Sequence, residues 1–256
     1  MSTAPVSPPV SRPATPAVTH ALILAAGRGE RMRPLTDARP KPLLEVQGKP
    51  LIVWQLEKLA RAGVRQVVIN TAWLGQKLEA ALGDGRRYGV NIHWSHEPEG
   101  QPLETAGGIV QALPMLGHDP FMLVNGDIWL RKHLTPLRTA LTSGRQAHLV
   151  LVDNPAHHPQ GDFLLACGAD PAVAGERHAL SSRDVAGQRL TYAGLAVYCP
   201  TLFQGLARGV RPLAPLLHEA IADGMVSGEY FPGPWVDVGT PERLRTLDAA
   251  IRDGSI

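Results

Sequence analysis

Cysteine is scarce in this chain of 256 residues, in which only Cys167 and Cys199 occur. Two thiols do not make a disulfide framework, and no Cys-x-x-Cys spacing is present. We therefore expect a protein of the reducing cytoplasm. Both cysteines are expected to act as small apolar fillers rather than as nucleophiles.

A strong charge imbalance and long apolar runs are missing as well. The formal net charge is +2, so charge alone gives no reason to expect a nucleic-acid or membrane surface. No stretch approaches the ~18 consecutive apolar residues that a membrane-spanning helix needs. Hydrophobic residues nevertheless make up 44% of the chain, which is enough for a sizeable core, and the length fits one large α/β domain.

Residues 1–18 differ in composition from the rest of the chain. They contain repeated prolines among serine, threonine, alanine and valine. Proline removes backbone donors and breaks helices, and the segment lacks the apolar core of a secretory signal. We predict a disordered leader over 1–18, with docking to a partner as the competing interpretation, and a single folded domain over 19–256.

From His20 onward, apolar runs rich in β-branched residues alternate with helical patterns. This alternation predicts a Rossmann-like α/β fold with a mostly parallel, doubly wound sheet and helices on both faces. Residues 153–190 lack periodicity and are predicted to form a hairpin or a long loop. The predicted strands are 21–25, 66–70, 91–95, 121–124, 147–152, 195–198 and 226–231, and the predicted helices are 51–62, 74–82, 105–113, 136–143, 212–222 and 241–252.

The first predicted strand ends in a glycine-bearing loop, Leu24-Ala25-Ala26-Gly27-Arg28-Gly29-Glu30-Arg31-Met32. The two glycines let backbone N–H groups approach phosphate oxygens, and Arg31 and Lys41 add positive charge. The loop lacks the Gly-Lys-Ser/Thr ending of a Walker motif. It also lacks the third glycine of a dinucleotide fingerprint, since Met32 stands there. The sequence therefore predicts a triphosphate-binding loop of another kind, with an ordinary strand-to-loop turn as the alternative.

The same loop, followed by Pro40-Lys41-Pro42-Leu43, resembles the signature of the sugar-1-phosphate nucleotidyltransferases. Members of that family make nucleotide sugars from a nucleoside triphosphate and a sugar 1-phosphate, on a fold of the nucleotide-diphospho-sugar transferase type. The resemblance covers residues 20–252. It implies a nucleotide-binding set of Ala25, Ala26, Gly27, Gly29, Glu30, Arg31, Lys41, Asn70, Gly107 and Asn125.

Two carboxylates in the sequence are candidates for a metal site. Asp127 ends Asn125-Gly126-Asp127, just after a predicted strand, and Asp237 lies in Trp235-Val236-Asp237-Val238-Gly239-Thr240. Ligands of open parallel sheets lie beyond the carboxyl ends of strands, so Asp127 and the glycine loop are expected at one edge. Mg²⁺ prefers one or two carboxylates together with phosphate oxygens and water. We predict that Asp127 and Asp237 hold one Mg²⁺, as the resemblance also implies, with turn formation and helix capping as competing interpretations.

The transfer from a triphosphate to a sugar phosphate needs no general base, because the attacking oxygen is already anionic near neutral pH. Bringing two anions together is the main barrier, so positioning and cations must carry the catalysis. We therefore predict Arg31 and Lys41 as catalytic residues beside Mg²⁺. The lack of an obvious catalytic His or Cys dyad agrees with this chemistry.

The signals for sugar binding are weaker. Glu104, Asp162 of Gly161-Asp162-Phe163, and Glu229 resemble family positions near the sugar, and all three are predicted to bind it. Their alternatives are a flexible helix start for Glu104 and solvated positions for the other two. His157 and His158 show no metal-ligand spacing and are interpreted as surface-loop residues.

Several strings, among them Asn70-Thr71-Ala72-Trp73-Leu74-Gly75 and Leu151-Val152-Asp153-Asn154-Pro155, resemble one subgroup of the family. That subgroup moves a uridylyl group from UTP to a lactyl-bearing sugar 1-phosphate in cell-wall recycling. The resemblance implies a cation for the lactyl carboxylate, for which Arg177 or Arg183 is the candidate. Mannose- or glucose-1-phosphate nucleotidyltransferases and a catalytically silent nucleotide sensor stay open as alternatives. The sequence indicates neither nucleic acid nor membrane as a partner and leaves the oligomeric state open.

Overall fold

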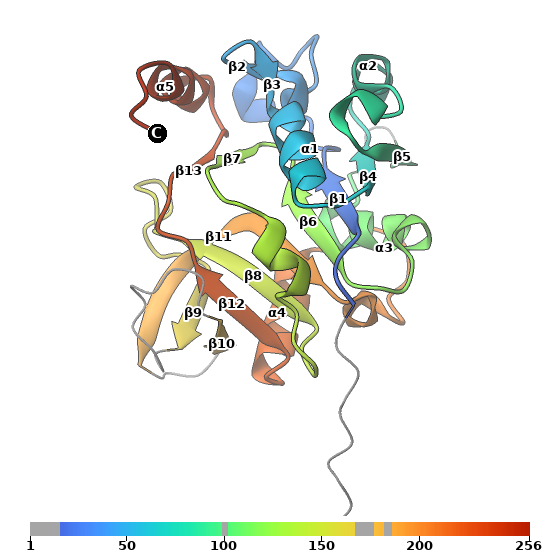
Figure 1. Ribbon diagram of the computed structural model, residues 1–256, viewed down its shortest axis with the longest axis vertical. Coiled ribbons are helices and arrows are strands. Elements are labelled where there is room, and N and C mark those ends of the chain that lie inside the picture. The colour runs from blue at the N-terminus through green and yellow to red at the C-terminus, as the bar shows by residue number, and fades with distance from the viewer. Residues whose placement is uncertain (1–15, 99–101, 167–176, 182–185) are drawn as a thin grey trace, which may run out of the picture.

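The structure, a computed structural model, describes residues 16–98, 102–166, 177–181 and 186–256 (Figure 1). Most of the predicted leader, together with Cys167 and Arg183, lies outside these residues. Cys199 carries a free thiol and is partly buried. Within the described ranges, no helix combines the length and the apolar character needed to cross a membrane.

A nine-stranded mixed sheet forms the centre of the fold (Figure 1). Its order is β5 (Asn91–His96), β4 (Gln66–Thr71), β1 (His20–Leu24), β6 (Phe121–Asn125), β11 (Gly187–Tyr198), β8 (Ala147–Val152), β12 (Val226–Tyr230), β10 (His178–Ser181) and β9 (Phe163–Ala166). The strands β5, β4, β1 and β6 run parallel, as do β8 and β12, whereas β11 is antiparallel to β6 and β8. The predicted α/β fold with parallel strands is confirmed. The antiparallel pairs of this sheet involve β9, β10 or β11, which lie in the second half of the chain.

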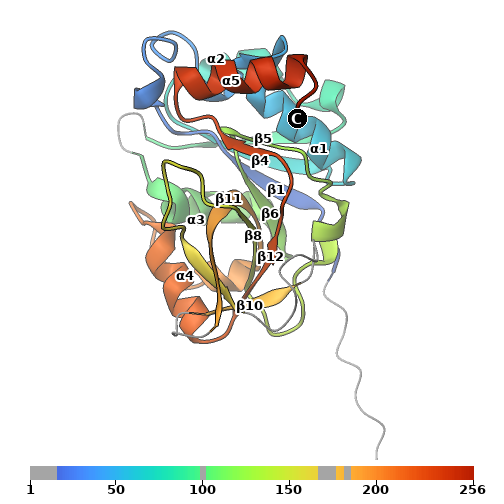
Figure 2. The same cartoon turned by 90° about the vertical axis from the view of Figure 1, so that its left-hand side faces the viewer.

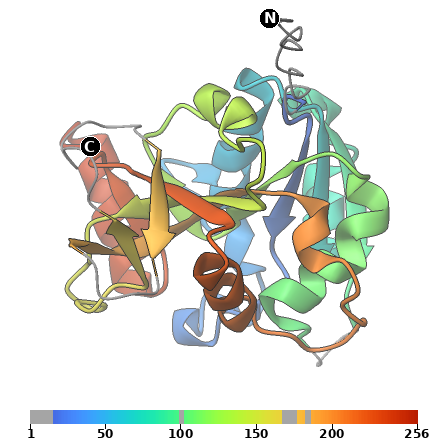
Figure 3. The same ribbon diagram turned by 90° about the horizontal axis from the view of Figure 1, so that it is seen from below.

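Helices cover both faces of this sheet (Figures 2 and 3). On one face, a buried apolar cluster is built with α1 (Leu51–Arg61), α2 (Gly75–Leu82) and the 3₁₀ segment η4 (Thr135–Thr139). On the other face, α3 (Glu104–Leu116) and α4 (Leu213–Ala222) lie side by side over a second cluster. Successive side chains of β1 point to opposite faces of the sheet, so Ala21 and Ile23 belong to the first cluster and Leu22 belongs to the second.

Two short antiparallel pairs lie outside the main sheet. β7 (Ile128–Leu130) pairs with β13 (Trp235–Asp237), and β2 (Glu45–Val46) pairs with β3 (Lys49–Pro50). The helix α5 (Pro241–Arg252) packs against both pairs at the top of Figure 1. A third apolar cluster fills the space beneath it, with Met32, Val46, Trp129, Val238 and Leu247 among its members.

The predicted helix over 136–143 is wrong, because this segment forms only the 3₁₀ segment η4. The carbonyl of Arg138 accepts a hydrogen bond from the Val18 N–H at 2.9 Å, and Arg138 Nε donates to the Val18 carbonyl at 2.8 Å. A carbonyl that is bound to a distant segment does not continue the i to i+4 ladder of an α-helix. The other predicted helices and strands are present, although β11 begins at Gly187 rather than at Leu195.

Candidate active site

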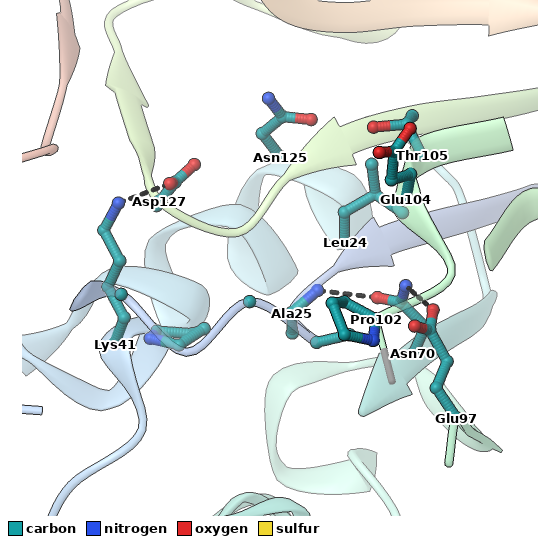
Figure 4. Close-up of a pocket in the computed structure, with 14 residues that line it drawn as sticks. Leu24, Ala25, Lys41, Asn70, Glu97, Pro102, Glu104, Thr105, Asn125 and Asp127 are labelled. Carbon is teal, nitrogen blue, oxygen red and sulfur yellow. Dashed lines mark hydrogen bonds and ion pairs between the residues drawn. The ribbon is translucent and has the colours of Figure 1, made fainter. Parts of the chain in front are cut away.

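A cavity of about 280 Å³ opens at the carboxyl ends of β1, β4 and β6 (Figure 4). The glycine loop and the Asn-Gly-Asp turn meet here, so the prediction that they share one edge is confirmed. The Gly126 N–H donates to the Leu24 carbonyl at 2.9 Å, and a Cβ at position 126 would lie 2.7 Å from that oxygen. Only glycine allows this approach. The cavity is lined by Leu24, Ala25, Ala26, Gly27, Gly29, Lys41, Pro42, Asn70, Glu97, Pro102, Glu104, Thr105, Asn125 and Asp127.

Asn70 and Glu97 form a buried polar pair at one end of this cavity (Figure 4). The Ala25 N–H donates to Asn70 Oδ1 at 2.6 Å, and Asn70 Nδ2 donates to Glu97 Oε1 at 2.7 Å. Glu97 Oε2 accepts from the Leu103 N–H at 3.1 Å. These bonds fix the orientation of the Asn70 amide. A carboxamide and a carboxylate have hydrogen-bonding capacity beyond them, so the pair can also meet a polar ligand.

The sequence prediction missed Glu97. Its signal is topological, because β5 is the parallel neighbour of β4 and Glu97 follows the end of β5. Gly108 makes room for the pair, since a Cβ there would lie 2.7 Å from Glu97 Oε1 and 2.9 Å from Asn70 Nδ2. Gly107, which was predicted to bind the nucleotide, does not line the cavity. A Cβ at Gly107 would overlap the carbonyl oxygen of Gly209, so this glycine serves the packing of α3.

Lys41 and Asp127 meet at the opposite end of the cavity (Figure 4). Lys41 Nζ lies 2.5 Å from Asp127 Oδ2, and the Lys41 side chain is only 10% exposed. Prolines on both sides of Lys41 restrict its backbone and so help to hold the side chain in this direction. The arrangement places one buried cation and one carboxylate where the glycine loop also lies.

Asp237 comes from β13, the strand that pairs with β7. The Val238 N–H donates to the Asp127 carbonyl at 3.0 Å, so the backbones that carry the two predicted metal ligands are direct neighbours. Val238 is buried in the third cluster, and alternation along the strand turns Asp237 away from it. The Asp237 carboxylate is bound by Arg243 Nη1 at 2.7 Å.

The two carboxylates fit a divalent cation. Asp127 is 33% exposed and Asp237 is 26% exposed, and Lys41 and Arg243 each contact the Oδ2 atom, so both carboxylates can also accept a ligand from solvent. Across the described residues, no group of three or more His, Cys, Asp or Glu side chains could hold a metal. Mg²⁺ is satisfied by one or two carboxylates if phosphate oxygens and water complete its octahedron.

A second cavity of about 340 Å³ adjoins the first, and Asn125 lines both. Arg31 and Asp237 line the second cavity, whereas Lys41 and Asp127 line the first. The two predicted catalytic cations therefore lie in different cavities that meet at the end of β6. The remaining lining residues of the second cavity are Ile128, His157, His158, Thr191, Tyr192, Ala193, Gly194 and Trp235.

Three further residues that were predicted to bind a substrate lie in different surroundings. Glu104 lines the first cavity and has a left-handed φ of 58°, a backbone strain that is typical of functional sites. Asp162 does not line either cavity, because its carboxylate accepts from the Tyr192 N–H at 2.8 Å and contacts His158 Nε2 at 3.0 Å. Glu30 is exposed and pairs with Arg28 at 3.2 Å.

Glu229, also predicted to bind the sugar, is buried in β12 and lines neither cavity. Its carboxylate lies 2.6 Å from Lys132 Nζ and 3.5 Å from His148 Nε2. Burial by itself raises the pKa of Glu229. The hydrogen bonds and charges of His148 and Lys132 outweigh burial, so the pKa ends below its ordinary value. In this structure Glu229 therefore belongs to an interior ion cluster.

The Lys132–Glu229 pair leads to a prediction about stability. Lys132→Met is expected to lower the free energy of unfolding by about 3–5 kcal/mol, because a buried carboxylate loses its cation. The lowered pKa of Glu229 adds a pH dependence. Its contribution is complete above the ordinary value of 4.5 and is lost as the pH falls through the lower folded value.

Urea denaturation of wild type, Lys132→Met and Glu229→Gln, from pH 7 down to about 3, measures both effects. The wild type should lose stability relative to Glu229→Gln below pH 4.5, the ordinary pKa of the carboxyl. A difference that stays constant over the whole range would contradict the assigned ionisation.

Comparison with known proteins identifies the family of this chain. Residues 20–163 match the family model described as "Nucleotidyl transferase", so the chain belongs to the nucleotidyl transferase family. The prediction of a sugar-1-phosphate nucleotidyltransferase is thereby confirmed. Among curated relatives, N-acetylmuramate alpha-1-phosphate uridylyltransferase of Neisseria meningitidis serogroup B is 50% identical over 90% of this chain and 96% of its own. The protein of the same name from Caulobacter vibrioides is 33% identical over 91% and 97%.

A more distant relative matches over most of this chain, and solved structures show the same fold. Mannose-1-phosphate guanylyltransferase catalytic subunit beta of Xenopus tropicalis is 28% identical over 88% of this chain and 62% of its own length. A structure of a glucose-1-phosphate thymidylyltransferase from Bacillus anthracis superposes with a TM-score of 0.75 at 21% identity, covering 93% of this chain and 96% of that one. A UDP-glucose pyrophosphorylase gives 0.73 at 18%, with coverages of 93% and 99%.

Proposed function

We propose that this protein transfers the uridylyl group of UTP to N-acetylmuramate α-1-phosphate and releases pyrophosphate. The observation that carries the proposal is the 50% identity to the Neisseria uridylyltransferase over nearly the full length of both chains. The site supports it, because a phosphate-binding glycine loop, two cations and two carboxylates gather at one edge of the sheet. Since UTP is an intracellular metabolite, we place the reaction in the cytoplasm and in the reuse of cell-wall sugars.

We propose Mg²⁺ as the cofactor, held by Asp127 and Asp237. When bound, the ion would neutralise charge on the phosphates as the two anionic substrates approach. The chain contributes the orientation of both carboxylates through the β7–β13 pair, and Arg243 keeps Asp237 in place by its 2.7 Å contact. No protein base is required, because the attacking phosphate oxygen carries no proton that must leave.

The remaining roles follow from position. Backbone N–H groups of the glycine loop and Lys41 are proposed to bind the triphosphate, while Asn70 and Glu97 meet the uracil at the other end of the same cavity. Arg31, which lines the second cavity beside Asp237, is proposed to bind the incoming sugar phosphate. Asn125 lines both cavities and thus lies at the point where the two substrates must meet.

A substrate matrix tests the proposal. Purified protein with Mg²⁺ is incubated with UTP, GTP or TTP and with the 1-phosphates of N-acetylmuramate, mannose or glucose, and pyrophosphate release is measured. We expect UTP with N-acetylmuramate α-1-phosphate to give the highest kcat/KM. The mannose-1-phosphate guanylyltransferase relatives make GTP with mannose 1-phosphate the second candidate, and a higher value for that pair would replace our proposal. Turnover with no pair would favour the nucleotide sensor instead.

A further inference from the structure

Two consecutive histidines on the loop between β8 and β9 line the second cavity. The sequence interpretation left His157 and His158 on a surface loop, and the roles assigned so far use neither. His157 is partly exposed, with 40% of its side chain accessible, and its Nε2 lies 3.9 Å from Asp237 Oδ2. An imidazole beside a proposed metal carboxylate and inside a substrate cavity is in position to contact the substrate.

We propose that His157 donates a hydrogen bond to the 1-phosphate of the sugar substrate and is a further catalytic residue, an assignment that rests on the transfer reaction proposed above. A neutral imidazole carries one N–H, and its tautomer follows the acceptor that it faces. The role therefore does not depend on a change in protonation.

The loop that carries His157 is fixed in place by polar contacts to β11. The Tyr192 N–H donates to Asp162 Oδ2 at 2.8 Å, and Thr191 Oγ1 donates to Asn154 Oδ1 at 2.8 Å. These contacts anchor the loop on both sides of His157. A donor held in advance by its surroundings loses little entropy when it meets an anion, as a catalytic contact requires.

Position relative to the carboxylates favours the phosphate as the group that His157 binds. In-line attack on the α-phosphorus brings the sugar 1-phosphate beside the metal ligands, and His157 is the histidine next to Asp237. His158 turns instead to Asp162, with Nε2 3.0 Å from Oδ1. Of the other lining residues with a side-chain nitrogen donor, Trp235 Nε1 donates to the Ala193 carbonyl at 2.9 Å and Asn125 also lines the first cavity, so we assign the phosphate to Arg31 and His157.

The test compares the Michaelis constants of the two substrates. In His157→Ala, which removes the N–H donor, the KM for N-acetylmuramate α-1-phosphate is expected to rise ~10- to 100-fold, the usual effect of losing a hydrogen bond to a charged group, with the KM for UTP unchanged. His118→Ala is the matched control, because His118 is exposed on the turn before β6, at the opposite end of the strand from the site. It should leave both constants unchanged.

Two further ligands show which part of the sugar His157 contacts. N-acetylglucosamine 1-phosphate lacks the lactyl group, and its KM, or its inhibition constant if it is not turned over, should rise as much as that of the lactyl-bearing substrate. Free N-acetylmuramate lacks the phosphate, and its inhibition constant should not change. A loss confined to the lactyl-bearing sugar, or weaker binding of the free sugar, would overturn the assignment to phosphate.

The outcomes also separate this inference from the proposed function. A wild-type enzyme that uses neither sugar phosphate with UTP contradicts the proposed transfer reaction itself. Normal wild-type turnover with unchanged constants in His157→Ala contradicts only the role of His157. An equal rise of both KM values would point to a structural role for His157 and would also reject the proposal.

Discussion

Replacing Lys41 by methionine is expected to lower kcat for pyrophosphate release by a factor of about 10²–10³, the usual cost of losing one preorganised charge at a transition state. Methionine keeps most of the length and apolar body of lysine and removes only the ammonium group. The partner carboxylate of Asp127 is 33% exposed and stays hydrated after the change, so the fold should survive. Steady-state kinetics with a thermal melt on the same sample measures both properties.

Lys77→Met is a suitable control for this experiment. Lys77 is exposed on α2, contacts the Ala38 carbonyl at 2.6 Å, and lines neither of the two cavities assigned to substrates. Its kcat should stay within about threefold of the wild type, well short of the loss of a preorganised charge. If Lys41→Met also stays within this range while its melting temperature is unchanged, Lys41 is not a transition-state cation.

The second large effect is expected at the carboxylate pair. Asp127→Asn should lower kcat by about 10²–10³ and should raise the Mg²⁺ concentration for half-maximal rate, because an amide oxygen is a weaker ligand for a hard cation. Asp237→Asn should do the same. Each change also weakens one ion pair, that of Asp127 with Lys41 at 2.5 Å or that of Asp237 with Arg243 at 2.7 Å, so a thermal melt of each variant separates lost rate from lost stability.

A titration of rate against Mg²⁺ measures this prediction, with Asp119→Asn as the control. Asp119 is exposed on the turn before β6, at the end of the strand opposite to Asp127. Two variants that lose rate but keep the wild-type Mg²⁺ dependence would show that the carboxylates act without holding the metal.

Local signals account for the parts of the fold that could be predicted from the sequence. The helix α5 begins as predicted because Thr240 accepts a hydrogen bond from the Arg243 N–H and Pro241 fits the first turn. The segment 136–143 carries helical spacing too, yet its Arg138 carbonyl is bound by Val18. No local pattern contains that contact, so a sequence argument cannot foresee it.

The same distinction explains the candidate site. Asp127 and the glycine loop could be placed together because both follow parallel strands, and the carboxyl ends of such strands share an edge. Glu229 could not be placed, because the strand pattern does not show that Lys132 and His148 surround it in the interior. The place of His157 in the second cavity could not be predicted either, because its loop shows no sequence pattern and is held by contacts with β11.

The pairing of β7 with β13 has a consequence for the synthesis of this enzyme. Chains are made and begin to fold from the N-terminus, so the glycine loop, Lys41 and Asp127 exist well before Asp237. Until β13 has been synthesised and has paired with β7, the growing chain lacks Asp237 and the strand against which α5 packs. If Asp237 holds the metal as proposed, a nascent chain can form much of the nucleotide pocket before it can catalyse the transfer, and activity begins only when β13 has paired with β7.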